Sequence, residues 1–569
     1  MENLYGSNNP NILDNYGATG LDSDGLKTDG STKTNVSPKT NSLVRKAPVP
    51  KEPPRYDSVD IAFVFVVPVL GFLFIKLAAA PALTQANMGA GISVFTLCFV
   101  VGVLIWLMKN GVKPSRSAWL GLAVVLLTGA YFSIYQNIVI QLLALPLLMA
   151  LAAYAVTLLG ERRIDKGAGD YLHFDLYGAL LAIPFSNFGK LLAICGDRMS
   201  KIKKSRNVLM VLLGLVIALP VAIYVGSLLQ SADAAFELVW RSFIGRFKLD
   251  DIVVTICQIT ISIPVSMYLF GMVYGTVKHR GEPHMSREEA EGTAEKAKLL
   301  PLYLMIGGVT PLLVLYLIFF FSQTAYFLSA FRGVLPRGLI YSEYARRGFF
   351  ELCNVCVVNL IVTAMLGLFT KDNKNSLISR VYGCLLALFS MAMIVMSLSK
   401  MLMYINVYGL TPLRVYTSWF MVFLFLLFAM VIVKHIRPGF HLLKYCVCCG
   451  VVMFLLLGYA DSDRIIAEYN VEAYRSGKVE ELDVRQLNEL GSAAAPYLLS
   501  ILTDENMPDE YRRQAGDALY ARIQSIGRRG EYKRDDWRSA TIAGYREKKL
   551  LTENKERIQG FRHAQGFRH

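Results

Sequence analysis

Ionisable residues are nearly missing from the long apolar runs of this chain. These runs are roughly 18 to 25 residues long, which is the length that crosses a hydrocarbon core about 30 Å thick. Lys76, Glu351 and Lys400 are the exceptions inside them, and Arg414 stands at the start of another run. Ion-coupled transporters and proton relays need ionisable groups at membrane depth. The scarcity therefore argues against both classes.

The sequence also lacks the short motifs of nucleotide, dinucleotide and zinc chemistry. It has no P-loop, no G-x-G-x-x-G, no H-E-x-x-H and no G-x-S-x-G in a strand–turn–helix setting. None of the seven histidines stands at catalytic or metal-ligand spacing from a carboxylate. We therefore predict a protein with no catalytic residues, no metal site and no cofactor.

Cysteine is missing from the soluble C-terminal part of the chain, so no disulfide framework is built there. All nine cysteines fall in or beside apolar segments. The pairs Cys353/Cys356 and Cys446/Cys449 have the C-x-x-C spacing of a thiolate metal site. The topology predicted below puts the two pairs near opposite faces of the membrane. This separation favours cysteines that simply pack between helices.

Apolar residues are what the chain has in abundance, at 54% with a mean hydropathy of +0.40. This is too apolar for an ordinary soluble protein. The pattern predicts an all-α fold, a polytopic α-helical membrane bundle of about eleven spans followed by a soluble α-helical domain. The predicted spans are 60–80, 88–108, 118–135, 138–159, 207–228, 252–275, 301–322, 350–370, 381–403, 415–434 and 442–460.

Lys and Arg are concentrated in alternate loops, which indicates the orientation of the spans. The loops 81–87 and 136–137 carry neither residue, so we assign them to the outside. This assignment makes the N-terminus cytoplasmic and the C-terminus extracytoplasmic in a cell membrane. The predicted parts are a disordered cytoplasmic tail (1–58), a transmembrane domain (59–460), an extracytoplasmic helical domain of hairpins or degenerate repeats (461–559) and a disordered end (560–569).

The apolar run 175–195 fits a full crossing poorly, because it is short and interrupted by Pro184 and Asn187. It leads into a basic cluster, and such a pair of segments is typical of an interfacial or re-entrant helix on anionic lipid. We therefore expect anionic lipid on the cytoplasmic side as a partner and, despite a net charge of +15, no nucleic acid. The predicted lipid-contact residues are Arg198, Lys201, Lys203, Lys204 and Arg206.

A ladder of alternating charge enters one predicted span. Glu343, Arg347 and Glu351 recur every four residues and so share one face of a helix. The turn Tyr408–Tyr416, with Thr411 as a predicted N-cap and Pro412 at the first helical position, lies on the same predicted side. The pattern fits a salt-bridged helix entrance, and it also fits a binding surface. The candidate binding residues are Glu343, Arg346, Arg347, Glu351, Tyr408 and Arg414.

Four motifs carry a resemblance to a known family: Tyr341-Ser-Glu-Tyr-Ala-Arg-Arg-Gly-Phe-Phe-Glu-Leu352, Tyr408-Gly-Leu-Thr-Pro-Leu-Arg414, Ile465-Ile-Ala-Glu-Tyr-Asn470 and Asp536-Trp-Arg-Ser539. In these motifs the chain resembles a bacterial family of multi-pass membrane proteins. The family is a domain of unknown function numbered four-one-seven-three, with its relative four-one-five-three. The resemblance implies an integral membrane protein and brings no catalytic residues.

Two functions stay open on the sequence. The first is a non-enzymatic envelope sensor or assembly scaffold whose helical domain 461–559 meets an envelope protein. The second is a transporter or flippase that uses the outer charged cluster as a gate. The near absence of charge at mid-membrane depth favours the first.

Overall fold

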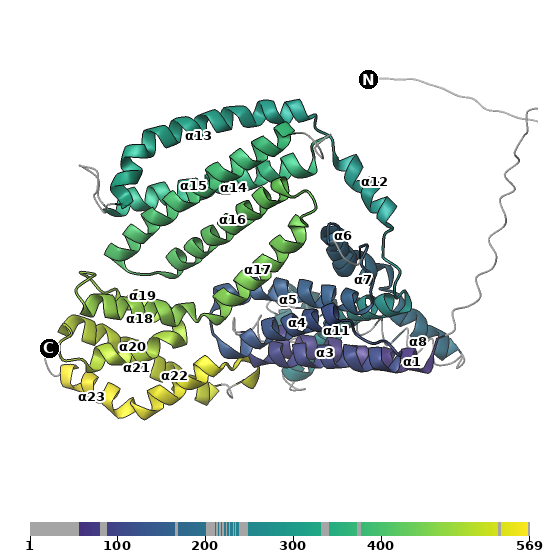
Figure 1. Cartoon of the computed structure of the whole chain (residues 1–569). Helices are drawn as coiled ribbons and strands as arrows, with labels where there is room; N and C mark the ends of the chain where they lie inside the picture. The colour runs from purple at the N-terminus through teal and green to yellow at the C-terminus, as the bar shows by residue number, and fades with distance from the viewer. Residues whose placement is uncertain are drawn as a thin grey trace, which may run out of the picture. The chain divides into compact units, whose positions relative to one another are not determined.

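A computed structural model of the chain describes residues 56–79, 88–165, 169–200, 249–331, 341–371, 377–532 and 536–566, with scattered positions between 211 and 237. Regular structure in these residues is helical, and the β pairing there is one isolated bridge between Leu300 and Thr370 (Figure 1). The predicted all-α class is confirmed. Residues 1–55 of the predicted disordered tail lie outside the described residues, and so does most of the predicted span 207–228.

The first group of membrane helices packs around one apolar core. Phe63 stacks on Trp106 with ring centroids 4.3 Å apart, and Phe270 completes the cluster. Gly71 lies so close to Ser266 that a Cβ on the glycine would overlap the serine hydroxyl. Small residues of this kind let membrane helices approach closely. The helices are α1 (Ser58–Leu73) with its π-helical continuation η1 (Phe74–Ala79), α3 (Ala90–Lys109), α4 (Arg116–Ile134), α5 (Ile138–Leu159) and α11 (Leu249–Lys278).

The second group has a core of its own, which includes Phe349, Met393 and Phe428. A buried polar chain crosses this core: Tyr316 donates to Asn359 at 2.5 Å, and Asn359 donates to Ser390 at 2.9 Å. Each polar group thus finds a partner away from water, as a bilayer interior demands. The helices are α13 (Leu302–Phe331), α14 (Tyr341–Leu368), α15 (Leu377–Tyr408), α16 (Pro412–Ile436) and, packed on α16, α17 (Leu442–Tyr459).

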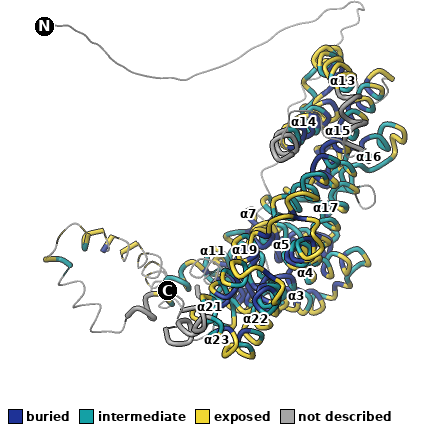
Figure 2. The backbone as a smooth tube through the Cα atoms, turned by 90° about the vertical axis from the view of Figure 1, so that its left-hand side faces the viewer, coloured by how far each residue is buried: buried dark blue, intermediate teal, exposed yellow. Residues whose placement is uncertain are grey.

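Eleven helical stretches in the described residues are long and apolar enough to cross a membrane, and ten of them match predicted spans. Large apolar side chains such as Leu120 and Phe321 are exposed on these helices, and exposed positions run along α13 and α16 (Figure 2). Exposed apolar surface of this extent fits helices that face lipid. The protein is therefore a multi-pass membrane protein.

The eleventh stretch, Leu172–Asp197, is a broken helix. Its middle packs against the last turns of α11, where Pro184 and Asn187 contact Gly271. Its first part lies at the end of α11 that holds Lys278, since Gly178 packs against His284 in the following loop. Its last part returns to α1, where the Asp197 carboxylate lies close enough to Tyr56 to act on it electrostatically. Both ends thus lie at one end of the bundle, which favours the re-entrant interpretation. The pieces are α6 (Leu172–Tyr177), η2 (Gly178–Ala182), α7 (Ile183–Ser186) and α8 (Lys190–Ser200).

The C-terminal domain is a separate helical unit with a third core, centred on Ile466, Leu498 and Leu519. The last helix ends at Gly566, and Phe561 within it packs on this core with the Arg512 guanidinium 5.3 Å from its ring. The disordered end expected from residue 560 stays a prediction. The helices are α18 (Ser462–Arg475), α19 (Val484–Glu489), η3 (Gly491–Ala494), α20 (Ala495–Thr503), α21 (Asp509–Tyr532), η4 (Trp537–Ser539), α22 (Ile542–Glu553) and α23 (Lys555–Gly566).

The turns between spans sort into two ends by their contacts. At one end, turns 88–90, 135–137 and 408–411 all contact the C-terminal domain, and we call this the docking end. At the opposite end, Gly281 donates to Gly160 at 3.0 Å and His441 lies 3.0 Å from Asp170. The helix α12 (Arg287–Ala297) follows this opposite turn. The docking end gathers the loops that the Lys and Arg distribution assigns to the outside. Which end faces the cytoplasm stays a prediction.

Candidate functional site

The turn between α15 and α16 is the first part of the docking interface. Gly409 adopts a positive φ of 75°, and Thr411 caps α16 by accepting from the Arg414 amide at 3.2 Å, which confirms the predicted cap. The Arg414 side chain closes the turn, because Nη1 donates to the carbonyls of Tyr408 and Gly409 at 2.9 and 2.5 Å. Its guanidinium also lies 4.1 Å from the Tyr404 ring centroid. Arg414 therefore closes and shapes the turn.

Asn470 of α18 holds this turn from the other side. Its Oδ1 accepts from the Leu410 amide at 2.7 Å, and its Nδ2 donates to the Leu410 carbonyl at 2.8 Å. A Cβ on Gly409 would lie 2.5 Å from Asn470 Oδ1, so a glycine is needed there for space as well as for φ. Two of the motifs noted in the sequence, 408–414 and 465–470, are thus bound to each other. A side-chain amide that pairs with both backbone groups of one residue fixes the register of the two segments.

A half-buried polar cluster joins α5, α16 and α18. Asn137 Nδ2 donates to both carboxylate oxygens of Asp463 at 2.9 and 2.8 Å and to the Tyr416 hydroxyl at 2.6 Å. Asn137 Oδ1 accepts from the Ile140 amide at 3.0 Å and so caps α5. Burial raises the pKa of the Asp463 carboxyl to about 6, against the opposing effect of the Asn137 donor. The carboxyl therefore titrates close to physiological pH.

The fourth sequence motif docks the domain on the first helix group. Arg538 Nε donates to both carboxylate oxygens of Asp536, at 2.7 and 2.9 Å. Its Nη1 donates to the Lys76 carbonyl at 2.7 Å. The Ala90 amide at the start of α3 donates to the Ala540 carbonyl at 3.0 Å. Since Lys76 lies in η1, the 536–540 turn spans the ends of two membrane helices. Arg538 Nη2 also donates to Asp536 Oδ2, which makes the pair bidentate, rigid and strongly held.

The predicted charged cluster is described only in part. The side chains of Glu343, Arg346 and Arg347 lie outside the described residues, although their backbone belongs to α14. Glu351 is exposed on α14 and acts electrostatically on Lys400 of α15, which is buried and packs against Gly348. The sequence pattern pairs Glu351 with Arg347, whose side chain lies outside the described residues, and it singles out Lys400 without linking it to Glu351. That Glu343, Arg347 and Glu351 converge with Arg414 stays a prediction. The lipid-contact side chains, from Arg198 to Arg206, also lie outside the described residues.

Sequence reasoning missed most residues of the docking interface. Asn137 and Asp463 carry no motif that links them, because they are more than 300 residues apart in the chain and pair only through the fold. Asn470, Asp536 and Arg538 stood inside the noted motifs without an assigned role. The usable signal was a polar residue with a short side chain directly beside a turn at the end of a span.

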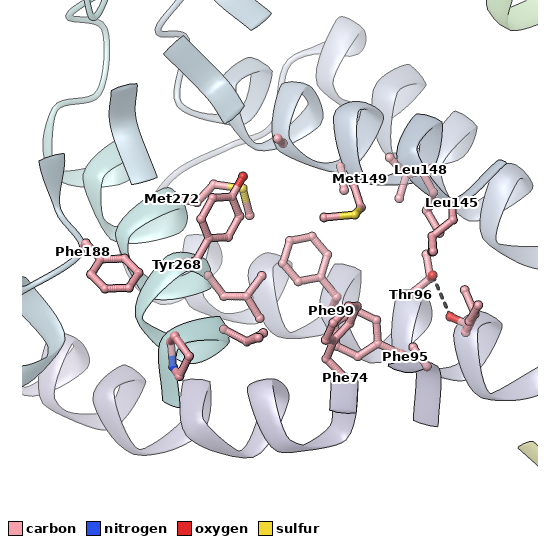
Figure 3. Close-up of a pocket in the computed structure, with 18 of the residues that line it drawn as sticks. Phe74, Phe95, Thr96, Phe99, Leu145, Leu148, Met149, Phe188, Tyr268 and Met272 are labelled. Carbon is pink, nitrogen blue, oxygen red and sulfur yellow. Dashed lines mark hydrogen bonds between the residues drawn. The ribbon is translucent and has the colours of Figure 1, made fainter. Parts of the chain in front are cut away.

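A second feature of the first helix group is an apolar cavity of about 450 Å³ between α3, α5, α7 and α11 (Figure 3). Phe99, Met149 and Tyr268 surround the space, and Phe74 and Phe95 lie together on one side of it (Figure 3). The two polar lining groups have partners within the protein: Thr96 donates to the Ile92 carbonyl at 2.8 Å, and Tyr268 donates to the Leu180 carbonyl at 2.9 Å. The cavity thus offers apolar contacts.

Comparison with protein families bears directly on this architecture. The family model described as a domain of unknown function, DUF4153, matches residues 122–501. The chain belongs to this family. The matched region runs from α4 through α20 and includes the α15–α16 turn and Asn470. The search of curated proteins and the search of solved structures found no match.

Proposed function

We propose that this DUF4153 protein is a non-enzymatic sensor or assembly scaffold of the bacterial cell envelope. In this proposal the C-terminal domain lies outside the cytoplasmic membrane and meets an envelope protein. The observation that supports it most is the docking interface. The domain binds the turns that the distribution of Lys and Arg assigns to the outside, so one face is held by the bundle while the rest remains available.

The docking contacts also suggest how a binding event reaches the membrane. Asn470 holds the α15–α16 turn, Asp463 holds the start of α5 through Asn137, and Arg538 holds the end of η1. A partner that shifts the domain therefore acts on three pairs of membrane helices at once. Coupling of this kind needs a continuous set of packed and hydrogen-bonded groups, which this interface provides.

Site-specific crosslinking tests the partner surface. A photoreactive residue at Glu480, exposed on the C-terminal domain, is expected to form adducts with a defined envelope protein in living cells. The matched position is Glu288, exposed on α12 at the opposite end, which is expected to give no adduct with that protein. Adducts from Glu288 and none from Glu480 would contradict the proposal.

A transporter or flippase is the second candidate. The observation that favours it is the buried Lys400 with the Glu351 carboxylate acting on it, since charged groups at the entrance of a span suit a gate. Changing Arg347 and Arg414 to Ala, alone and together, separates the two functions at equal expression. Loss of the crosslink with intact solute flux in vesicles supports the sensor, and the reverse result supports the transporter.

A further inference from the structure

The apolar cavity reaches the surface of the helix bundle between membrane spans. Met149 of α5 and Phe185 of α7 both line it and are 50% and 56% exposed, and Pro264 of α11 is exposed beside them. α5 and α11 are spans, and Met149 and Pro264 lie near their middles, away from the turns at either end. In a bilayer this surface faces hydrocarbon. The molecules that reach the cavity from there are therefore lipid chains.

The lining decides which part of a lipid fits. Its described residues include no charged one, and the Thr96 and Tyr268 hydroxyls already donate within the protein. A headgroup or an ion would lose its hydration without gaining a partner, which is costly. An alkyl chain meets rings and methyl groups. The volume of about 450 Å³ lies within the range of roughly 300–1,000 Å³ for ligand sites.

Irregular helices build the walls of this cavity, which explains why the neighbouring side chains do not close it. Phe74 and Ala78 line it from the π-helical turn η1, and Pro264 lines it from α11. On α5 the lining residue Leu145 precedes Pro146, and α7 follows the π-helical turn η2. Proline and π-helical turns shift the backbone away from regular packing and recur at functional sites. Ala152 and Ala153 add little bulk.

We propose that this cavity binds one acyl chain of a membrane phospholipid. We name phospholipid as the occupant because its acyl chains are the apolar groups that surround the opening of the cavity in any bilayer. The proposal is independent of the sensor function, since the described residues that line the cavity make none of the docking contacts described above. It adds a lipid-binding site to the membrane domain.

Photolabelling of the full-length protein in nanodiscs of phosphatidylglycerol and phosphatidylethanolamine tests this site. The probe is a phospholipid with a diazirine in one acyl chain. We expect labelled peptides from α3, α5 and α11 to exceed those from the lipid-facing surface of α13 about tenfold. Excess unlabelled phospholipid should compete more strongly at the first set. Equal labelling of both sets overturns the proposal without any variant.

A matched pair of substitutions on α5 adds specificity. Ala152→Phe fills the cavity and is expected to reduce cavity labelling about tenfold, whereas Ala150→Phe, on a residue outside the lining, should leave it unchanged. Equal labelling of the two variants contradicts the site. Repeating the assay with a polyprenyl probe gives a further outcome: labelling by that probe alone, with none by phospholipid, shows that the acyl-chain assignment is wrong.

Discussion

Replacing Asn470 with Ala is expected to loosen the C-terminal domain from the α15–α16 turn. The change removes two side-chain hydrogen bonds and leaves the Leu410 amide and carbonyl without these partners in a half-buried position. The expected loss is about 2 kcal/mol of docking free energy, which corresponds to roughly 30-fold faster local opening. Hydrogen exchange of the peptide that contains Leu410 measures this opening directly.

Asn506→Ala provides the control for this prediction. Asn506 is an exposed loop residue of the same domain, so the same substitution there removes no docking contact. Its exchange at Leu410 should match that of the unchanged protein. If Asn470→Ala exchanged no faster than Asn506→Ala, the two motifs 408–414 and 465–470 would not hold the domain in place.

Acidification is expected to strengthen docking through Asp463. Burial raises the folded-state pKa from 3.8 to about 6, so the folded protein binds a proton that the unfolded chain releases between these values. The stabilisation is fully present below the unfolded pKa and is lost as the pH rises through the folded pKa. From these two pKa values, the contribution at pH 5 exceeds that at pH 7.5 by about 1.4 kcal/mol. Thermal unfolding followed across this pH range measures it.

The neighbouring groups define the controls for the pH prediction. Asp463 faces the Asn137 amide, the hydroxyls of Tyr131 and Tyr416, and the carboxyl of Asp461. Asp463→Asn should flatten the pH dependence. Adding Asp461→Asn should flatten it further, because burial raises the pKa of that carboxyl as well. Glu505→Gln, on an exposed loop, should leave the profile unchanged. A profile that Asp463→Asn does not alter would assign the effect to other groups.

The membrane helices were predictable because their signal is local. Each span is a continuous apolar run. The start of α16 is also visible in the sequence, because Thr411 is a typical N-cap and Pro412 suits the first helical position. The segment 172–197 was harder to place, because its length and hydropathy reach those of a span while Pro184, Asn187 and the basic cluster after it favour a re-entrant helix. Its contacts with Gly271 and α1 support the re-entrant interpretation. Hydropathy reports the length and polarity of a segment, but it does not report on which side of the membrane the segment ends.

The docking interface was not predictable in the same way. Asn137 and Asp463 contribute one side chain each to a pairing that exists only after the bundle and the domain have both folded. Arg414 shows the opposite limitation. Its position suggested an outward-facing binding residue, whereas much of its hydrogen-bonding capacity is used by the Tyr408 and Gly409 carbonyls. A charged residue beside a turn has to satisfy local carbonyls before it is free for a ligand.

The central claim is that the docking end and its helical domain lie outside the cytoplasm. Single cysteines at Glu480 and Glu288, introduced into a protein whose nine native cysteines have been replaced, test it with a membrane-impermeant maleimide on spheroplasts. The account predicts that Glu480→Cys is labelled in intact spheroplasts and that Glu288→Cys is labelled only after permeabilisation. The reverse pattern would put the C-terminal domain in the cytoplasm and contradict the proposed envelope function.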